Sequence, residues 1–159
     1  MSVKIQIDNL SKIFGHYPGR AFKLLDKGMG KDEILEKSGQ AIGMARVTFS
    51  VYEGETLVVM GLSGSGKSTL LRCVNRLIRP TRGKVTVDGI DVTGLHRKEL
   101  LKLRREKFGM VFQNFGLFPH RSVLANTEYG LEIQGVDKNE RIEKSMKSLE
   151  LVGLKGWED

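Results

Sequence analysis

Apolar and polar residues alternate along two stretches of the chain, Val3 to Leu10 and Met44 to Val51. Such alternation puts the apolar side chains on one face, which is typical of a half-buried β-strand. A third stretch, Lys84 to Gly89, alternates in the same way and ends in Asp-Gly, which predicts a hairpin. These stretches predict an antiparallel β subdomain from residues 1–60 and 84–91.

Two shorter stretches are apolar without alternation, and they predict strands of a different kind. Leu57 to Met60 runs into a glycine-rich loop, and Phe108 to Gln113 ends at a polar amide. Continuous apolar runs of this length are consistent with strands that are buried on both faces.

Helical periodicity begins after the glycine loop, where Leu70, Leu71, Val74 and Leu77 share one face, so residues 61–78 are predicted to form a loop and a helix. Between the first two strands, residues 15–43 are expected to be an inserted surface element with short helices around residues 21–25 and 31–37.

Three further helices are predicted in the second half of the chain, over residues 95–107, residues 122–133 and from Asp137 onward. Asp137 and Glu140 resemble a capping box, in which each residue satisfies an amide of the other. Ile142, Met146 and Leu149 follow at helical spacing and predict a core-facing stripe.

Composition limits the class of protein. The 159 residues are 40% hydrophobic and 28% charged, which suits one folded domain. The sequence contains neither an apolar run of about 20 residues nor the apolar core of a secretory signal, so we expect a cytosolic chain. The single cysteine, Cys73, excludes an internal disulfide and a multi-cysteine metal site, and its place on an apolar helix face predicts a buried, inert thiol.

The formal net charge of +7 permits a polyanionic partner, either nucleic acid or an anionic membrane surface. Much of the charge lies between Leu95 and Lys107, where leucines and two glutamates interrupt the basic residues. A solvated helix face is the interpretation that this pattern favours.

The glycine-rich loop carries the chemistry. Gly61, Gly66, Lys67 and Ser68 satisfy the pattern G-x-x-x-x-G-K-[ST], between an apolar run and a helix. The glycines let the backbone N–H groups turn inward around an anion, and the helix N-terminus adds partial positive charge. Lys67 would neutralise the β- and γ-phosphates, Ser68 would bind Mg²⁺, and Thr69 would contact the α-phosphate. The loop predicts nucleotide binding without choosing between ATP and GTP.

Three segments read together, "VVMGLSGSGKSTLLRCVNRL", "PTRGKVTVDG" and "MVFQNFGLFPHRSVLANTEYG", resemble the nucleotide-binding subunit of an ATP-binding cassette (ABC) transporter. The insert and the run "GLSGSGKSTLLRCVNRLIRPTRG" are similar to the glycine betaine/proline betaine importers of bacterial osmoprotection. The resemblance implies an α/β fold, a P-loop NTPase of ABC type that is incomplete here: the β subdomain, the Walker A strand, loop and helix, a Q-loop strand over residues 108–113, and the start of a helical subdomain over residues 114–159.

The resemblance also implies roles for individual residues, with ATP and Mg²⁺ as cofactors. Phe14 would stack on the adenine, Lys67 and Gln113 would act in catalysis, and Ser68 and Gln113 would contact Mg²⁺. The implied nucleotide-binding residues are Phe14, Gly61, Ser63, Gly64, Ser65, Gly66, Lys67, Ser68 and Thr69. A core position at the end of the first strand is the alternative for Phe14.

The implied partners are those of a transporter. A membrane permease subunit would contact the loop from Gln113 to Pro119 and the following helices, a second ATPase subunit would form a homodimer, and a substrate-binding protein would act indirectly. Packing within the domain is the alternative for some of these residues. The protein would then be cytoplasmic and peripheral on the inner face of the membrane, and a nucleic-acid partner is not expected.

The family pattern continues with an LSGGQ-like signature, a Walker B aspartate with the catalytic glutamate, and a switch histidine, and none of these is present. We therefore expect a truncated chain that is inactive in ATP hydrolysis alone and poorly stable. Two alternatives to the transport ATPase are a nucleotide-binding regulatory remnant and a DNA-associated ABC ATPase of the repair type.

Overall fold

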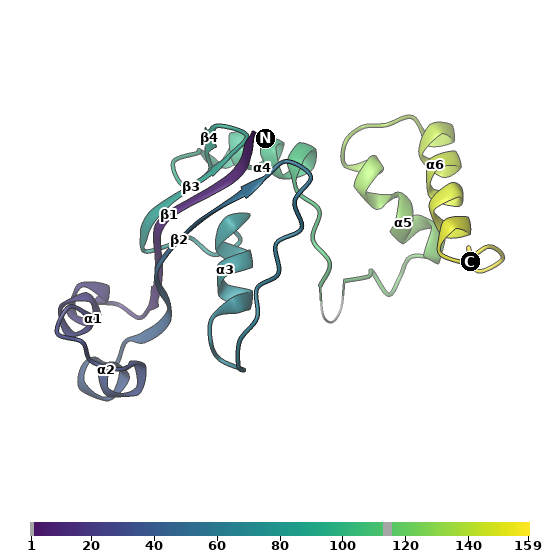
Figure 1. Cartoon of the computed structure of the whole chain (residues 1–159). Helices are drawn as coiled ribbons and strands as arrows, with labels where there is room; N and C mark the ends of the chain where they lie inside the picture. The colour runs from purple at the N-terminus through teal and green to yellow at the C-terminus, as the bar shows by residue number, and fades with distance from the viewer. Residues whose placement is uncertain (1, 113–115) are drawn as a thin grey trace. The chain divides into compact units, whose positions relative to one another are not determined.

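The computed structural model describes residues 2–112 and 116–159, and the chain divides into two compact units, Met1–His96 and Arg97–Asp159. The first unit contains the sheet, the insert and the glycine loop, and the second contains three helices (Figure 1). The second unit begins with the basic helix.

The sheet of the first unit is antiparallel throughout, as predicted, with the strand order β2-β1-β3-β4. Its strands are β1 (Val3–Phe14), β2 (Ala41–Tyr52), β3 (Arg82–Val87) and β4 (Ile90–Asp91). β1 and β2 extend beyond the alternating stretches and form a long two-stranded ribbon at their far ends. This extension carries the first strand as far as Phe14.

The predicted hairpin is confirmed between β3 and β4. Val87 pairs with Ile90, and both turn residues have positive φ, 48° at Asp88 and 78° at Gly89. Two positive φ values are what a type I′ turn requires, and Asp-Gly satisfies this requirement at little cost. The core around these strands includes Ile7, Leu10, Val85, Val87 and Val92.

The insert forms the two helices that were predicted, α1 (Pro18–Leu25) and α2 (Lys31–Ser38), at the end of the β1–β2 ribbon (Figure 1). It has a small core of its own. Ile13 and Ile42 from the ribbon pack with Ala21, Phe22 and Ile34 from the helices, and all five are buried. The insert is thus a folded element at the end of the ribbon, with a core of its own.

The prediction of two strands from the continuous apolar runs is wrong for the residues that the structure describes. Residues 57–60 form no strand beside the described sheet, and neither do residues 108–112. Val58 and Met60 are exposed to 68% and 86%. A parallel strand takes its hydrogen bonds and burial from neighbouring strands, and the described residues supply none.

The helix after the glycine loop is α3 (Lys67–Val74), and the helices of the second unit are α4 (Arg97–Lys107), α5 (Val123–Glu132) and α6 (Lys138–Leu151). None of the helices in the described part of the chain is both long and apolar enough to span a bilayer.

Side-chain caps fix the starts of α5 and α6. Ser122 accepts a hydrogen bond from the Ala125 N–H, which fixes the start of α5. Asp137 caps α6 through the Asn139 N–H, whereas Glu140 pairs with Lys144 at 2.6 Å, so the predicted reciprocal capping box does not form. In the predicted stripe of α6, Leu149 is buried and Ile142 and Met146 are half-buried.

Candidate nucleotide-binding site

The loop between residue 61 and α3 has the backbone shape that its glycines predict. Gly64 and Gly66 have φ values of 76° and 100°, which side-chain-bearing residues rarely adopt. A Cβ placed on Gly66 would lie 2.1 Å from the carbonyl oxygen of Gly43 in β2. Gly66 is therefore required both by its conformation and by the close approach of the loop to the sheet.

The first turn of α3 opens directly from this loop. Gly66 is the N-cap and has no side chain to satisfy the first amides, and the first backbone bond of the helix runs from the Leu70 N–H to the Gly66 carbonyl at 2.8 Å. The amides of the first turn have no partner within a helix, and they lie at its positive end. An anion bound at this point would satisfy them.

The Lys67 side chain folds back over the loop. Its Nζ donates to the carbonyl oxygens of Gly61 at 2.7 Å and Leu62 at 2.8 Å, with the Ser65 hydroxyl oxygen at 3.5 Å. The loop thus holds its cation against its own backbone. Phosphate oxygens are stronger acceptors than neutral carbonyls, so a bound phosphate would compete for this ammonium.

The hydroxyl groups of the loop lie on its accessible side. Ser63, Ser65 and Ser68 are exposed and Thr69 is partly buried. Among the described residues, no group of three or more histidine, cysteine or acidic side chains could hold a metal. Mg²⁺ commonly takes only one or two protein oxygens and completes its shell with phosphate and water, and the exposed hydroxyl of Ser68 is compatible with this role.

The structure brings Phe14 to the same place as the loop helix. A Cβ on Gly43 would lie 2.7 Å from Phe14 Cε2 and 3.1 Å from Thr69 Cγ2, so the aromatic ring and the threonine methyl group approach one glycine. Phe14 is 41% exposed, which rules out the alternative of a core residue. Its exposed ring remains a predicted stacking platform.

An apolar groove of about 510 Å³ adjoins the loop. It is lined from β2, from the extended residues 57–60 and from the loop and α3, including Phe49, Met60, Gly66 and Leu70.

Gln113, the predicted catalytic and magnesium-binding amide, lies outside the described residues, together with Asn114 and Phe115. Cys73 is buried as predicted, and burial raises the pKa of its thiol to about 11. A thiol in this environment is protonated at neutral pH, which agrees with an inert role.

Two lysines near the site were not singled out from the sequence. Lys12 Nζ lies 4.9 Å from the centre of the Phe14 ring, and Lys31 Nζ lies 3.5 Å from the Gly64 carbonyl oxygen. The first follows from strand geometry, since residues two apart share a face. The second depends on how the insert folds back, and nothing in the local sequence indicates it.

Comparisons with known proteins agree on one family. Residues 44–157 match the model of the ABC transporter family. The chain is 53% identical to the glycine betaine transport ATP-binding protein OpuAA of Bacillus subtilis over 98% of this chain and 37% of that protein. It is 49% identical to the glycine betaine/proline betaine transport system ATP-binding protein ProV of Escherichia coli over 99% of this chain and 39% of that protein.

A solved structure gives the same result. The ATP-binding cassette MJ0796, in a dimeric post-hydrolysis state bound to ADP and Pi, superposes with a TM-score of 0.73 at 31% identity, over 92% of this chain and 56% of that chain. The two transport proteins, OpuAA and ProV, are much longer than this chain, which spans less than half the length of each.

Proposed function

Because this chain belongs to the ABC transporter family, we propose that it is part of the ATP-binding subunit that energises an importer for glycine betaine, proline betaine or a similar compatible solute. The single observation that supports the proposal is the loop before α3, where positive-φ glycines, a helix N-terminus and Lys67 lie together, as an anion site would require.

The loop residues would divide the work of holding the nucleotide. The amides of residues 63–69 would surround the phosphates, and Lys67 would move from the loop carbonyls to the β- and γ-phosphates. Ser68 would give one oxygen to Mg²⁺, which when bound would neutralise charge on the phosphates. Phe14 would stack on the adenine from the end of β1.

Hydrolysis would need groups that the described residues do not contain. Phosphoryl transfer depends mostly on positioning and electrostatics, so a positioned carboxylate and Gln113 are the expected additional parts. We propose that a second copy of the subunit closes over the nucleotide, as the dimeric state of MJ0796 suggests for that cassette.

We propose that the membrane permease docks on the loop that precedes α5 in the second unit. Leu117 is 74% exposed and Phe118 is 37% exposed, in the loop that precedes α5. Exposed apolar side chains grouped on one loop favour a protein partner. A permease docked here would place the subunit on the inner face of the membrane.

A transport assay tests this function. Cells that lack their own betaine uptake would express the native protein with its transporter, as wild type, Lys67→Ala or Lys155→Ala. Lys155 is an exposed lysine that pairs with Glu150 at 2.7 Å, so it is the matched control. We expect uptake of labelled glycine betaine with wild type and Lys155→Ala, and loss of at least nine-tenths of it with Lys67→Ala.

Two results would contradict the proposal. Full uptake with Lys67→Ala would separate the loop from transport. Nucleotide binding by wild type without uptake of any compatible solute would favour the nucleotide-binding regulatory protein instead.

A further inference from the structure

The loop before α5 ends in a tight β-turn, whose backbone is bound by a side chain of α5. The Arg121 N–H donates to the Phe118 carbonyl oxygen at 3.1 Å, which closes a β-turn with Pro119 at its second position. Proline is favoured there because its fixed φ matches the turn. The turn brings Phe118 back beside the start of the helix.

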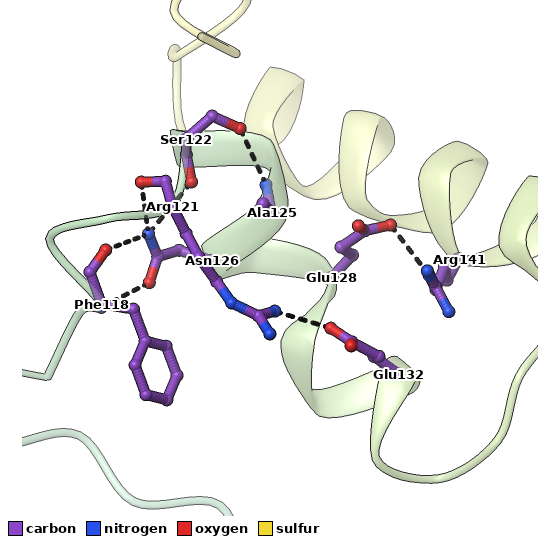
Figure 2. A network of polar contacts seen from close by, with 8 residues as sticks. All are labelled: Phe118, Arg121, Ser122, Ala125, Asn126, Glu128, Glu132 and Arg141. Atoms are coloured by element: carbon purple, nitrogen blue, oxygen red, sulfur yellow. Dashed lines mark hydrogen bonds and ion pairs between the residues drawn. The ribbon is translucent and has the colours of Figure 1, made fainter.

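Asn126, in α5, binds this turn at several points (Figure 2). Its Oδ1 accepts from the Phe118 N–H at 2.7 Å. Its Nδ2 lies 3.1 Å from the carbonyl oxygens of both Phe118 and Arg121 and 3.0 Å from that of Ser122. One amide therefore satisfies the backbone of Phe118 in both directions and shares its two hydrogens among three carbonyls.

Side chains from the turn then pack on α5. The ring of Phe118 meets Tyr129 edge to face, with 4.7 Å between centroids and 68° between planes. The Arg121 guanidinium lies 5.0 Å from the centre of the Tyr129 ring. Arg121 also donates to Glu132 at 2.6 Å (Figure 2). These contacts point the ring of Phe118 in one direction relative to the helix.

This arrangement lies near the surface of the second unit. No residue of α5 is buried, and both Leu117 and Phe118 remain exposed beside the turn. Because the Asn126 side chain makes several contacts with the backbone of the turn, it fixes the shape of the exposed apolar surface formed by Leu117 and Phe118. Fixing a docking surface before binding lowers the conformational entropy lost when a partner binds.

We propose that Asn126 is a positioning residue that holds the turn of residues 118–121 in the shape presented to the permease. The inference rests on the proposed function, since the permease is the partner proposed there. Asn126 acts through the backbone of the turn, which its side-chain amide contacts at Phe118 and Arg121.

The test compares Asn126→Asp with Asn139→Asp in the native protein. The first variant would keep the acceptor for Phe118 but lose the donor to three carbonyls, and a carboxylate near a helix N-terminus does not destabilise the helix itself. Asn139 lies in the first turn of α6 and is exposed, so its variant makes the same chemical change away from the turn.

Three readouts separate the outcomes: hydrogen exchange of the turn amides, nucleotide affinity, and binding to proteoliposomes that contain the permease subunit. For Asn126→Asp we expect turn exchange at least tenfold faster and permease affinity at least tenfold weaker, with nucleotide affinity and α6 protection unchanged. Asn139→Asp should match wild type in all three.

Unchanged permease affinity in Asn126→Asp would overturn the positioning role, even with faster exchange. Absence of nucleotide or permease binding in wild type would instead overturn the proposed function. Phe118→Ala gives an independent check, because it removes the ring but leaves the backbone held. It should weaken permease binding about tenfold while the turn amides stay protected, and wild-type binding in this variant would contradict the proposal.

Discussion

Gly66→Ala is the substitution whose consequence follows most directly from the geometry. The new methyl group would lie 2.1 Å from the Gly43 carbonyl oxygen, against a shortest ordinary contact of 3.0 Å. Both atoms belong to the backbone or are fixed to it, so no flexible side chain can give way. The loop must move away from β2 by roughly an ångström.

The cost has two parts. A left-handed conformation costs a residue with a side chain about 1–2 kcal/mol, and forcing an extra carbon into a packed contact costs about 1–3 kcal/mol. Gly54→Ala serves as the control, because Gly54 has a φ of 76° and nothing within 4 Å of an added Cβ. It carries the first cost alone and lies outside the loop.

Titration with a fluorescent ATP analogue measures the difference. Displacing the loop moves the amides that would surround the phosphates, so we expect at least tenfold weaker affinity in Gly66→Ala, which corresponds to about 1.4 kcal/mol. Gly54→Ala should bind as wild type does. Equal affinity in the two variants would refute the link between the packing of the loop on β2 and nucleotide binding.

Further predictions concern the insert, the thiol and the turn before α5. Phe22→Ala should lower the free energy of unfolding of the insert by about 3–5 kcal/mol, because Phe22 is buried in the insert core with the Arg82 guanidinium 3.8 Å from its ring centre. Hydrogen exchange of α1 and α2 measures this loss of stability, and a loss below about 1 kcal/mol would contradict the prediction. Cys73 should react with iodoacetamide at pH 8 about 100-fold more slowly in the folded than in the unfolded protein, since its pKa is raised to about 11, and equal rates would show an accessible thiolate. The hydrogen bond from Arg121 lowers the pKa of Glu132. The stabilisation from this pair should therefore be present above the ordinary glutamate pKa of 4.5 and be lost as pH falls through the lower pKa of the folded state. NMR titration of the Glu132 carboxyl carbon checks that the pKa is lowered, and an ordinary glutamate pKa would contradict the prediction.

The elements that could be predicted from the sequence are those specified by local chemistry. Asp88 and Gly89 determine a hairpin turn by themselves, Ser122 begins a helix, and the loop from residue 61 to Ser68 specifies its own conformation through its glycines. Each signal lies within a few residues of the structure that it predicts, so no distant partner is needed.

The features that could not be predicted depend on distant partners. The apolar run 57–60 has the composition of a buried strand, but a strand exists only where another strand pairs with it. The contact of Lys31 with Gly64 spans 33 positions, and Asn126 faces Phe118 because a turn folds back on the helix. None of these pairings leaves a periodic signal in the sequence.

Calorimetric titration of the native protein with ATP in the presence of Mg²⁺ tests directly whether the loop before α3 binds nucleotide. We expect saturable binding by wild type, binding at least tenfold weaker in Lys67→Ala, and weaker binding by wild type when Mg²⁺ is removed. Absence of ATP binding in wild type, or equal affinity in Lys67→Ala, would contradict this expectation.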